Sequence, residues 1–312
     1  MNIYQDLSEI DRPFARACVT IGNFDGVHLG HRQLFTEVVK RARSRGGPSV
    51  VVTFDPHPLR ILKPDAIKLI STIDQKIEQI EAAGIDVLII IPFSKDFAAT
   101  SAERFVNEIL LVTIGMAELV VGYDYAFGKG RGGDTHFLRQ QGRLHGFPVT
   151  VIEPFYVDGM LVSSTRIREL VAQGRMGDAA TLLGRPYQIR GVVQQGKKRG
   201  GQVIGFPTAN LAVNEEDLVP KIGVYVTEVL FDGTRFGGVL NIGYNPTFAE
   251  NKLVAETHIF DFDKEIYGRP IRINLLQYLR PEQKYESIGA LTRQIQRDAN
   301  QAREILAQRK KT

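Results

Sequence analysis

Residues 20–31 constrain the fold more than any other stretch of this 312-residue chain. A short apolar segment, residues 18–21, runs into a glycine-containing turn, and a helix-forming run, residues 32–43, follows. A strand, a glycine turn and a helix start in succession create an anion site, because unpaired backbone N–H groups and the positive helix end converge there. His28 and His31 are spaced i, i+3 and therefore share one face of that helix start.

Two interpretations of this turn are open. It lacks the Lys-Ser/Thr of a Walker phosphate loop. Its layout suits an enzyme that attacks the α-phosphate of a nucleoside triphosphate and releases pyrophosphate, with the two imidazoles stabilising the developing charge. Alternatively the histidines are a structural or zinc-binding pair, although six histidines and one cysteine in the whole chain leave few further ligands.

The first 185 residues alternate short apolar runs with helical patterns. Buried parallel strands are predicted at residues 50–54, 87–91, 118–121 and 149–152, which are rich in β-branched residues. Helices are predicted at residues 72–83, 101–110 and 134–145. This alternation predicts a doubly wound, Rossmann-like α/β domain over residues 1–185 with ligands at the carboxyl ends of the strands.

The pattern changes near Arg185, and residues 186–312 are predicted to form a second domain. Strands are expected at residues 189–193, 224–231, 234–242, 253–262 and 271–278, with an Asp-Gly hairpin turn at residues 232–233. No long helix separates them, which indicates an antiparallel β-barrel. A final amphipathic helix is predicted from about residue 282 to residue 308, packed on the barrel.

Four motifs carry a resemblance to a known family. They are Gly-x-Phe-Asp-x-x-His-x-Gly-His at residues 22–31, Ser-Ser-Thr-x-Ile-Arg at 163–168, Pro-Thr-Ala-Asn at 207–210 and Glu-x-His-Ile-x-Asp-Phe at 256–262. Together they resemble the bacterial bifunctional riboflavin kinase/FAD synthetase family. The resemblance implies that the C-terminal domain phosphorylates riboflavin with ATP to give FMN and ADP. It implies that the N-terminal domain joins FMN to AMP from ATP, giving FAD and pyrophosphate, and that both steps use Mg²⁺.

The resemblance also implies roles for residues of the N-terminal half. His28 and His31 are the expected catalytic pair, and the expected nucleotide-binding residues of the turn are Gly22, Asn23, Phe24, Asp25 and Gly30. Ser and Thr at a helix start are first of all caps. By resemblance, Ser164, Thr165 and Arg168 instead hold the β- and γ-phosphates at a helix N-terminus.

A glycine-rich loop with aromatic residues follows the strand predicted at residues 118–121. From its residues alone, the segment 122–134 is equally a mobile surface loop or a ligand-binding loop. The resemblance favours flavin binding, with Phe54, Tyr123, Asp124 and Phe127 as the flavin-binding residues. Ala126 departs from the family pattern, which usually has Arg there.

The C-terminal half carries a second set of expected site residues. By resemblance, Thr208 and Asn210 are oxygen ligands of Mg²⁺, and the nucleotide is bound by Gly196, Gly205, Pro207 and Asn210. A lone Glu in an alternating strand normally faces solvent, but the resemblance makes Glu256 the base that accepts the ribityl hydroxyl proton. Residues 241–248 match a further family segment and are expected to shape the pocket.

Composition sets the remaining expectations. The net charge of +4 favours anionic partners without identifying them, since nucleotides, phosphorylated metabolites and RNA all qualify. The resemblance implies riboflavin, FMN, FAD and ATP as partners rather than nucleic acid. The single cysteine, Cys18, excludes an internal disulfide and predicts a cytoplasmic protein, and no apolar run reaches the roughly 18 residues of a membrane span. Two alternatives remain: an adenylyltransferase for another phosphorylated metabolite with a structural barrel, and an RNA-binding protein with a small barrel.

Overall fold

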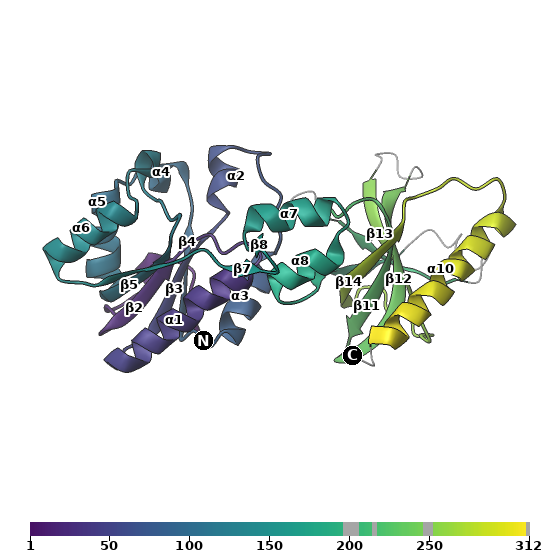
Figure 1. Cartoon of the computed structure of the whole chain (residues 1–312), viewed down its shortest axis with the longest axis horizontal. Helices are drawn as coiled ribbons and strands as arrows, with labels where there is room; N and C mark the ends of the chain where they lie inside the picture. The colour runs from purple at the N-terminus through teal and green to yellow at the C-terminus, as the bar shows by residue number, and fades with distance from the viewer. Residues whose placement is uncertain (196–205, 214–216, 246–251, 310–312) are drawn as a thin grey trace. The chain divides into compact units, whose positions relative to one another are not determined.

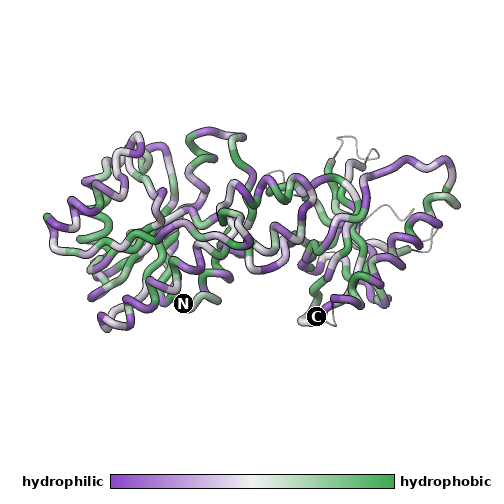
Figure 2. Tube along the Cα trace, viewed as in Figure 1, coloured by the Kyte–Doolittle hydropathy of each residue, from purple (hydrophilic) through white to green (hydrophobic). Residues whose placement is uncertain are grey.

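The computed structural model describes residues 1–195, 206–213, 217–245 and 252–309 (Figure 1). The chain divides into two compact units, residues 1–164 and residues 165–312. Figure 2 shows apolar residues following the strands in both units. The expected glycines Gly196 and Gly205 and residues 246–248 of the pocket segment lie outside the described residues.

The first unit is built on a six-stranded parallel sheet. Its strands lie in the order β1-β4-β3-β2-β5-β6 and all their pairings are parallel. Their bounds are β1 Asn2–Tyr4, β2 Ala17–Ile21, β3 Ser49–Asp55, β4 Val87–Pro92, β5 Met116–Gly122 and β6 Val149–Ile152. The predicted strands are therefore confirmed within one to two residues, and β1 is an edge strand that the sequence analysis did not predict.

Helices cover both faces of this sheet. The principal ones are α1 Leu29–Arg45, α3 Ile73–Ala82, the π-helix η2 Phe105–Ile114 and α6 Thr135–His145; short elements are η1 Leu7–Glu9, α2 Pro58–Leu62, α4 Lys95–Ala98, α5 Ala102–Arg104 and η3 Lys129–Arg131. Helices α1 and α3 pack on one face, through residues such as Phe35 and Ile80. Helices η2 and α6 pack on the other, through residues such as Leu110 and Leu138. The doubly wound prediction is confirmed.

The topology places a switch point between β2 and β5. Strands β3 and β4 lie on one side of β2, whereas β5 and β6 lie on the other. In open α/β sheets, ligands bind in the crevice at the carboxyl ends of the strands where the strand order reverses. The turn after Ile21 and the loop after Gly122 flank this position.

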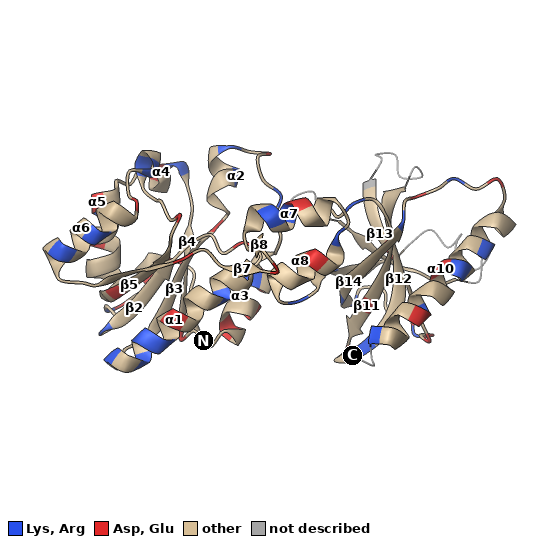
Figure 3. Ribbon diagram, viewed as in Figure 1, with Lys and Arg blue, Asp and Glu red and all other residues tan. Residues whose placement is uncertain are grey.

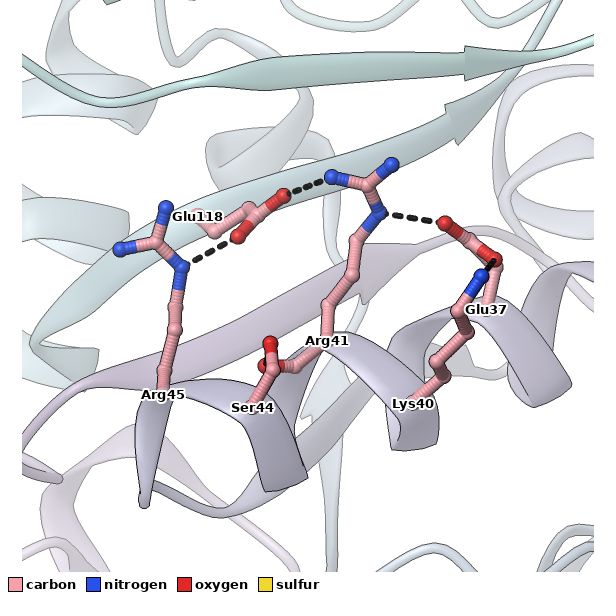
Figure 4. Close-up of polar contacts among 6 residues, drawn as sticks. All are labelled: Glu37, Lys40, Arg41, Ser44, Arg45 and Glu118. Atoms are coloured by element: carbon pink, nitrogen blue, oxygen red, sulfur yellow. Dashed lines mark hydrogen bonds and ion pairs between the residues drawn. The ribbon is translucent and has the colours of Figure 1, made fainter.

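A buried carboxylate anchors α1 to the sheet (Figure 4). Glu118 of β5 accepts hydrogen bonds from Arg41 at 2.5 Å and from Arg45, and Arg41 also contacts Glu37 at 2.6 Å. Lys and Arg residues gather along the C-terminal half of this helix (Figure 3), where cations suit the helix dipole. Cys18 pairs in register with Glu118, and burial raises the pKa of its thiol to about 12, so Cys18 is a structural residue.

The second unit contains a closed antiparallel barrel of six strands. The strand order is β10-β13-β12-β11-β14-β9. Their bounds are β9 Tyr187–Gln194, β10 Ala209–Ala212, β11 Gly223–Phe231, β12 Thr234–Asn245, β13 Lys252–Ile259 and β14 Pro270–Arg280. The barrel prediction is confirmed, with β10 as an additional strand. The hairpin β7 Tyr156–Val157 and β8 Met160–Leu161 belongs to the first unit.

The last helix begins later than predicted. Helix α10 runs from Ile288 to Arg309, whereas the sequence predicted a start near residue 282. Ser287 caps it, because its hydroxyl accepts a hydrogen bond from the N–H of Ala290 at 3.2 Å. Residues 281–287 thus form a connecting segment that carries side chains of a site described below.

The helices α7 Ser164–Ala172 and α8 Met176–Leu183 lead into the barrel. Helix α8 packs on β9 and β14, and its Met176, Ala179, Leu182 and Leu183 are buried. Fully burying a Leu side chain contributes about 1.5–3 kcal/mol, so a barrel fragment without α8 loses several such contributions. The domain boundary at 185 stays a prediction, and this packing suggests a direct test of it.

We expect a fragment of residues 165–312 to unfold at a clearly higher temperature than a fragment of residues 186–312. The reason is the apolar surface of β9 and β14 that α8 covers. Thermal unfolding followed by circular dichroism measures the difference. Equal midpoints would show that α8 adds nothing to the barrel and would support a boundary at residue 185.

Candidate active sites

The turn between β2 and α1 is tightly constrained. Phe24 and Val27 have positive φ angles of 47° and 38°, which non-glycine residues rarely adopt. Gly22 is required because a Cβ there would lie 2.8 Å from the Phe24 ring. Phe24 itself is buried and packs edge-on against His31 and Phe35 at centroid distances of 5.2 and 4.9 Å. Its ring therefore anchors the turn.

The two predicted catalytic histidines lie together at the start of α1. Their rings stack with centroids 3.5 Å apart and planes 17° apart. His28 is the N-cap residue, and its Nδ1 accepts a hydrogen bond from the backbone N–H of His31 at 3.3 Å. A neutral His28 in this arrangement carries its proton on Nε2, which makes that nitrogen a hydrogen-bond donor. Gly30 leaves room for the His28 ring, since a Cβ there would lie 3.3 Å from it.

Asp25 organises the turn from inside. Its buried carboxylate accepts hydrogen bonds from the backbone N–H groups of Ile70 and Ser71 at 3.0–3.2 Å. The Ser71 hydroxyl accepts a hydrogen bond from the N–H of Gly26 at 3.0 Å, and the Ser164 hydroxyl donates to the Asp25 carbonyl at 2.9 Å. Ser164 therefore lies beside the turn, and its predicted contact with phosphate stays a prediction. Thr165 and Arg168 lie in α7 and belong to the second compact unit.

The loop after β5 is held by aromatic packing. Phe127 stacks on Tyr125 at 5.4 Å and contacts Phe105 at 5.3 Å, and it pairs with Gly133 through two backbone hydrogen bonds of 2.8 and 3.0 Å. Phe54 at the end of β3 is buried against Phe93 and Phe97.

Tyr123 and Asp124, by contrast, are exposed; Tyr123 has 44% of its surface accessible. The predicted flavin-binding residues thus divide into two groups. Phe54 and Phe127 pack among aromatic residues that support the loop, and Tyr123 and Asp124 are exposed at its surface.

The second site lies on the outer face of the barrel. Glu256 of β13 stands in register between Asn210 of β10 and Asn241 of β12. Directly paired residues share a face of the sheet. The adjacent residues Leu211, Ala255 and Ile242 have no accessible surface and fill the barrel interior, so the row containing Glu256 faces outward.

A cavity of about 300 Å³ lies over Glu256 and Asn241 of this row. Glu256, Asn241 and Thr208 line it from the barrel side, and Leu291, Ile295 and Ala299 of α10 line it from the opposite side. The alternating pattern of this strand left open that Glu256 faces bulk solvent. Its side chain instead faces the cavity. Burial raises the pKa of the Glu256 carboxyl, and the nearby Glu282 carboxylate raises it further.

Contacts around the cavity fix its walls. Asn241 donates a hydrogen bond to Glu282 at 3.1 Å, and only a glycine at position 243 leaves room for that carboxylate. The Nδ1 of His258 lies 2.9 Å from the carbonyl oxygen of Pro207, which holds the segment before β10 against β13.

An ion pair joins α10 to the barrel beside the cavity. Arg280 of β14 contacts Asp298 of α10 through two nitrogens at 2.7–3.0 Å, and both side chains are largely buried. A bidentate, charge-assisted pair of this kind fixes the position of the helix and stabilises its packing on the barrel.

The sequence analysis missed the side chains that the connecting segment and α10 contribute. Glu282, Gln283 and Tyr285 of the connecting segment line the cavity. The sequence analysis had included these residues in the predicted helix that begins near residue 282. The Tyr285 hydroxyl is buried with no hydrogen-bond partner among the described residues, so a bound ligand could supply one. Pro281 and the cap at Ser287 were the available signals for this loop.

Two further observations concern the described residues as a set. No cluster of three His, Cys, Asp or Glu side chains there could hold a metal, so His28 and His31 have no further zinc ligands of those types among them. No helix in the described part of the chain is both long and apolar enough to cross a bilayer.

The two halves define a class of protein: a phosphate-transferring enzyme with two sites. A doubly wound domain carries a histidine pair at a helix start near its switch point, and a closed barrel carries a half-buried carboxylate beside hydroxyl and amide oxygens. Family models match both halves. The FAD synthetase model matches residues 11–166, and the riboflavin kinase model matches residues 183–306.

Relatives cover nearly the whole chain. Bifunctional riboflavin kinase/FMN adenylyltransferases from Listeria monocytogenes and Escherichia coli K12 are each 36% identical to it, over 93% and 98% of this chain and 92% and 98% of theirs. A crystal structure titled "Macrolide-efflux Protein from Streptococcus pneumoniae" has a TM-score of 0.87 and 30% identity, covering 96% of this chain and 98% of that one. The chain belongs to the bifunctional riboflavin kinase/FMN adenylyltransferase family. The predicted family and both predicted activities, each with ATP as co-substrate, are confirmed.

Proposed function

We propose that the first unit adenylylates FMN at the turn between β2 and α1. This proposal is supported by the stacked pair His28 and His31, which lies at the positive end of α1 beside the switch point of the sheet. As the FMN phosphate oxygen attacks the α-phosphorus of ATP, negative charge builds on the α-phosphate oxygens. The Nε2–H of His28, the His31 ring and the helix N-terminus stabilise that charge while pyrophosphate leaves.

The remaining residues of this unit bind and orient. The backbone of Gly22, Asn23 and Gly30 forms the nucleotide turn, and Phe24 and Asp25 fix its shape from behind. The assignment of Ser164, Thr165 and Arg168 to the β- and γ-phosphates rests on their sequence motif alone, and Thr165 and Arg168 belong to the second compact unit. Tyr123 and Asp124 bind the flavin beside the wall that Phe54 and Phe127 support.

The kinase reaction is assigned to the cavity on the barrel. Glu256 accepts the proton of the ribityl 5′-hydroxyl as that oxygen attacks the γ-phosphorus of ATP and ADP leaves. The observation that carries this assignment is that Glu256 and its cross-strand neighbour Asn241 line a cavity whose opposite side is formed by α10. The raised pKa of the half-buried Glu256 makes its carboxylate a stronger base than an exposed one.

The oxygen donors near Glu256 fit Mg²⁺. Thr208 lines the cavity, and Asn210 is the direct cross-strand neighbour of Glu256. The Asn210 amide donates to the Thr208 carbonyl at 3.4 Å, which orients its oxygen away from that carbonyl. Hydroxyl and amide oxygens are suitable hard ligands, and a bound Mg²⁺ neutralises charge on the ATP phosphates. Pro207 fixes the entry to β10 through its carbonyl contact with His258.

We expect Thr208→Ala to weaken the Mg²⁺–ATP complex in the kinase reaction, because it deletes a proposed oxygen ligand. The KM for ATP should rise about tenfold at low Mg²⁺, roughly the loss of one hydrogen bond to a charged group, and excess Mg²⁺ should restore part of the rate. FMN formation across a Mg²⁺ titration measures this. Adenylylation of supplied FMN serves as the internal control and should not change. A response to Mg²⁺ identical to that of the wild type would remove Thr208 from the metal site.

The compartment is also part of the proposal. The chain has one cysteine, Cys18, which is free and buried. Low cysteine usage without a disulfide is typical of proteins in a reducing cytoplasm, and we propose that location.

A further inference from the structure

A buried lysine lies close to the proposed nucleotide turn and has no role in the chemistry described above. Lys76 of α3 is only 6% exposed. Lysine is almost never buried unless its ammonium group is paired, because removing a charge from water is costly. The surroundings of Lys76 must therefore compensate for its burial.

Lys76 is linked to the turn by two hydrogen bonds. Its ammonium group donates to the Thr53 hydroxyl at 3.4 Å. That hydroxyl in turn donates to the backbone carbonyl of Asn23 at 3.3 Å. Thr53 is fully buried in β3, so the relay runs through the interior of the first unit and ends on the turn itself.

Two carboxylates near the same ammonium group set the charge of this region. The electrostatic partners of Lys76 are Asp25, which is buried in the turn, and Asp55, which is exposed at the end of β3. Desolvation lowers the pKa of Lys76, and both carboxylates oppose that shift. A protonated Lys76 reduces the summed charge of the three groups from two negative charges to one, beside the turn proposed to bind a triphosphate.

We propose that Lys76 is a positioning residue of the adenylylation site: it offsets the charge of Asp25 and Asp55 and, through Thr53, holds the Asn23 carbonyl. The turn between β2 and α1 is thereby kept able to accept the triphosphate of ATP. This inference rests on the proposed assignment of ATP to that turn.

Charge substitutions in the full-length enzyme test the inference. Lys76→Met replaces the ammonium group with an apolar side chain of similar length, while Asp25 keeps its three hydrogen-bond donors. The KM for ATP in FMN adenylylation, at saturating FMN, should rise about tenfold or more, because the repulsion from the carboxylates is no longer offset. The kcat should change less, because Lys76 touches none of the reacting atoms.

Asp55 supplies the complementary change. Asp55→Asn alters an exposed side chain and removes one of the two negative charges near the turn. Because less negative charge then repels the triphosphate, the KM for ATP should fall. In the double variant Lys76→Met/Asp55→Asn the sum of charges returns to that of the wild type, and the KM should fall most of the way back. A role confined to packing would give no such restoration. Thermal unfolding of each variant reports on folding, and the riboflavin kinase rate, which is assigned to the second unit, should not change.

The matched control is Lys40→Met, because Lys40 is 77% exposed on α1. It should leave both activities unchanged. If Lys76→Met is folded and its KM for ATP equals that of the wild type, or if Asp55→Asn restores nothing, the proposal is wrong. If Lys76→Met does not fold, an unchanged KM in Asp55→Asn alone overturns it. The proposal fails separately from the site assignment, since loss of adenylylation in His31→Ala is independent of Lys76.

Discussion

We expect His31→Ala to slow FMN adenylylation by about 10²-fold or more, while riboflavin phosphorylation by the same molecule continues at its normal rate. Loss of one preorganised donor to a developing oxyanion typically costs about 10²- to 10³-fold in kcat. His31 stands at the positive end of α1 and stacks on His28, so its removal takes away a donor from the position where charge develops. Product formation from FMN and ATP, and from riboflavin and ATP, gives the two rates.

The stacked geometry makes a control necessary. His31 also packs edge-on against Phe24, so its truncation leaves a small space in the turn. Thermal unfolding of His31→Ala should therefore be measured beside its activity. His145→Ala, on an exposed residue at the end of α6, should change neither rate. A parallel fall of both activities in a folded His31→Ala protein contradicts the assignment of His31 to adenylylation.

Much of the fold could be predicted because its local patterns agree with the tertiary structure. Val50, Val51 and Val52 are all fully buried, as expected for a central parallel strand covered on both faces. The strands that were missed are short. Strand β10 has the sequence Ala-Asn-Leu-Ala, which has no β-branched residue, and it is a strand because it pairs with β9 and β13.

The site was predictable only where a motif is continuous in sequence. His28 and His31, or Thr208 and Asn210, are close along the chain, and their motifs identify them. Arg280 and Asp298 meet across a strand and a helix, and no local pattern indicates such a pair. Lys76 stands in an amphipathic helix, where a lysine is normally expected on the exposed face. Its burial follows from the fold, and so does its connection to Asn23.

Glu256→Gln should lower the kinase kcat by about 10²-fold or more and leave the binding of ATP and riboflavin largely intact. Glutamine preserves the shape and hydrogen-bonding capacity of the side chain but cannot take up the proton, and general base catalysis is worth about 10²- to 10⁴-fold. Glu256 is suited to this task because it is half-buried on the cavity wall and lies near Glu282. Desolvation and the Glu282 carboxylate both raise the pKa of its carboxyl.

The decisive measurement is single-turnover FMN formation across a Mg²⁺ titration, with Glu256→Gln and Thr208→Ala side by side. Excess Mg²⁺ should recover part of the rate of Thr208→Ala, because that variant has lost an oxygen ligand, but it cannot supply the proton acceptor that Glu256→Gln lacks. Glu265→Gln changes an exposed carboxylate of the same unit and should behave as wild type. Adenylylation of supplied FMN should be unaffected in all three variants. Near-normal turnover in Glu256→Gln would show that another group accepts the proton, and Glu256 would then serve only to shape the cavity.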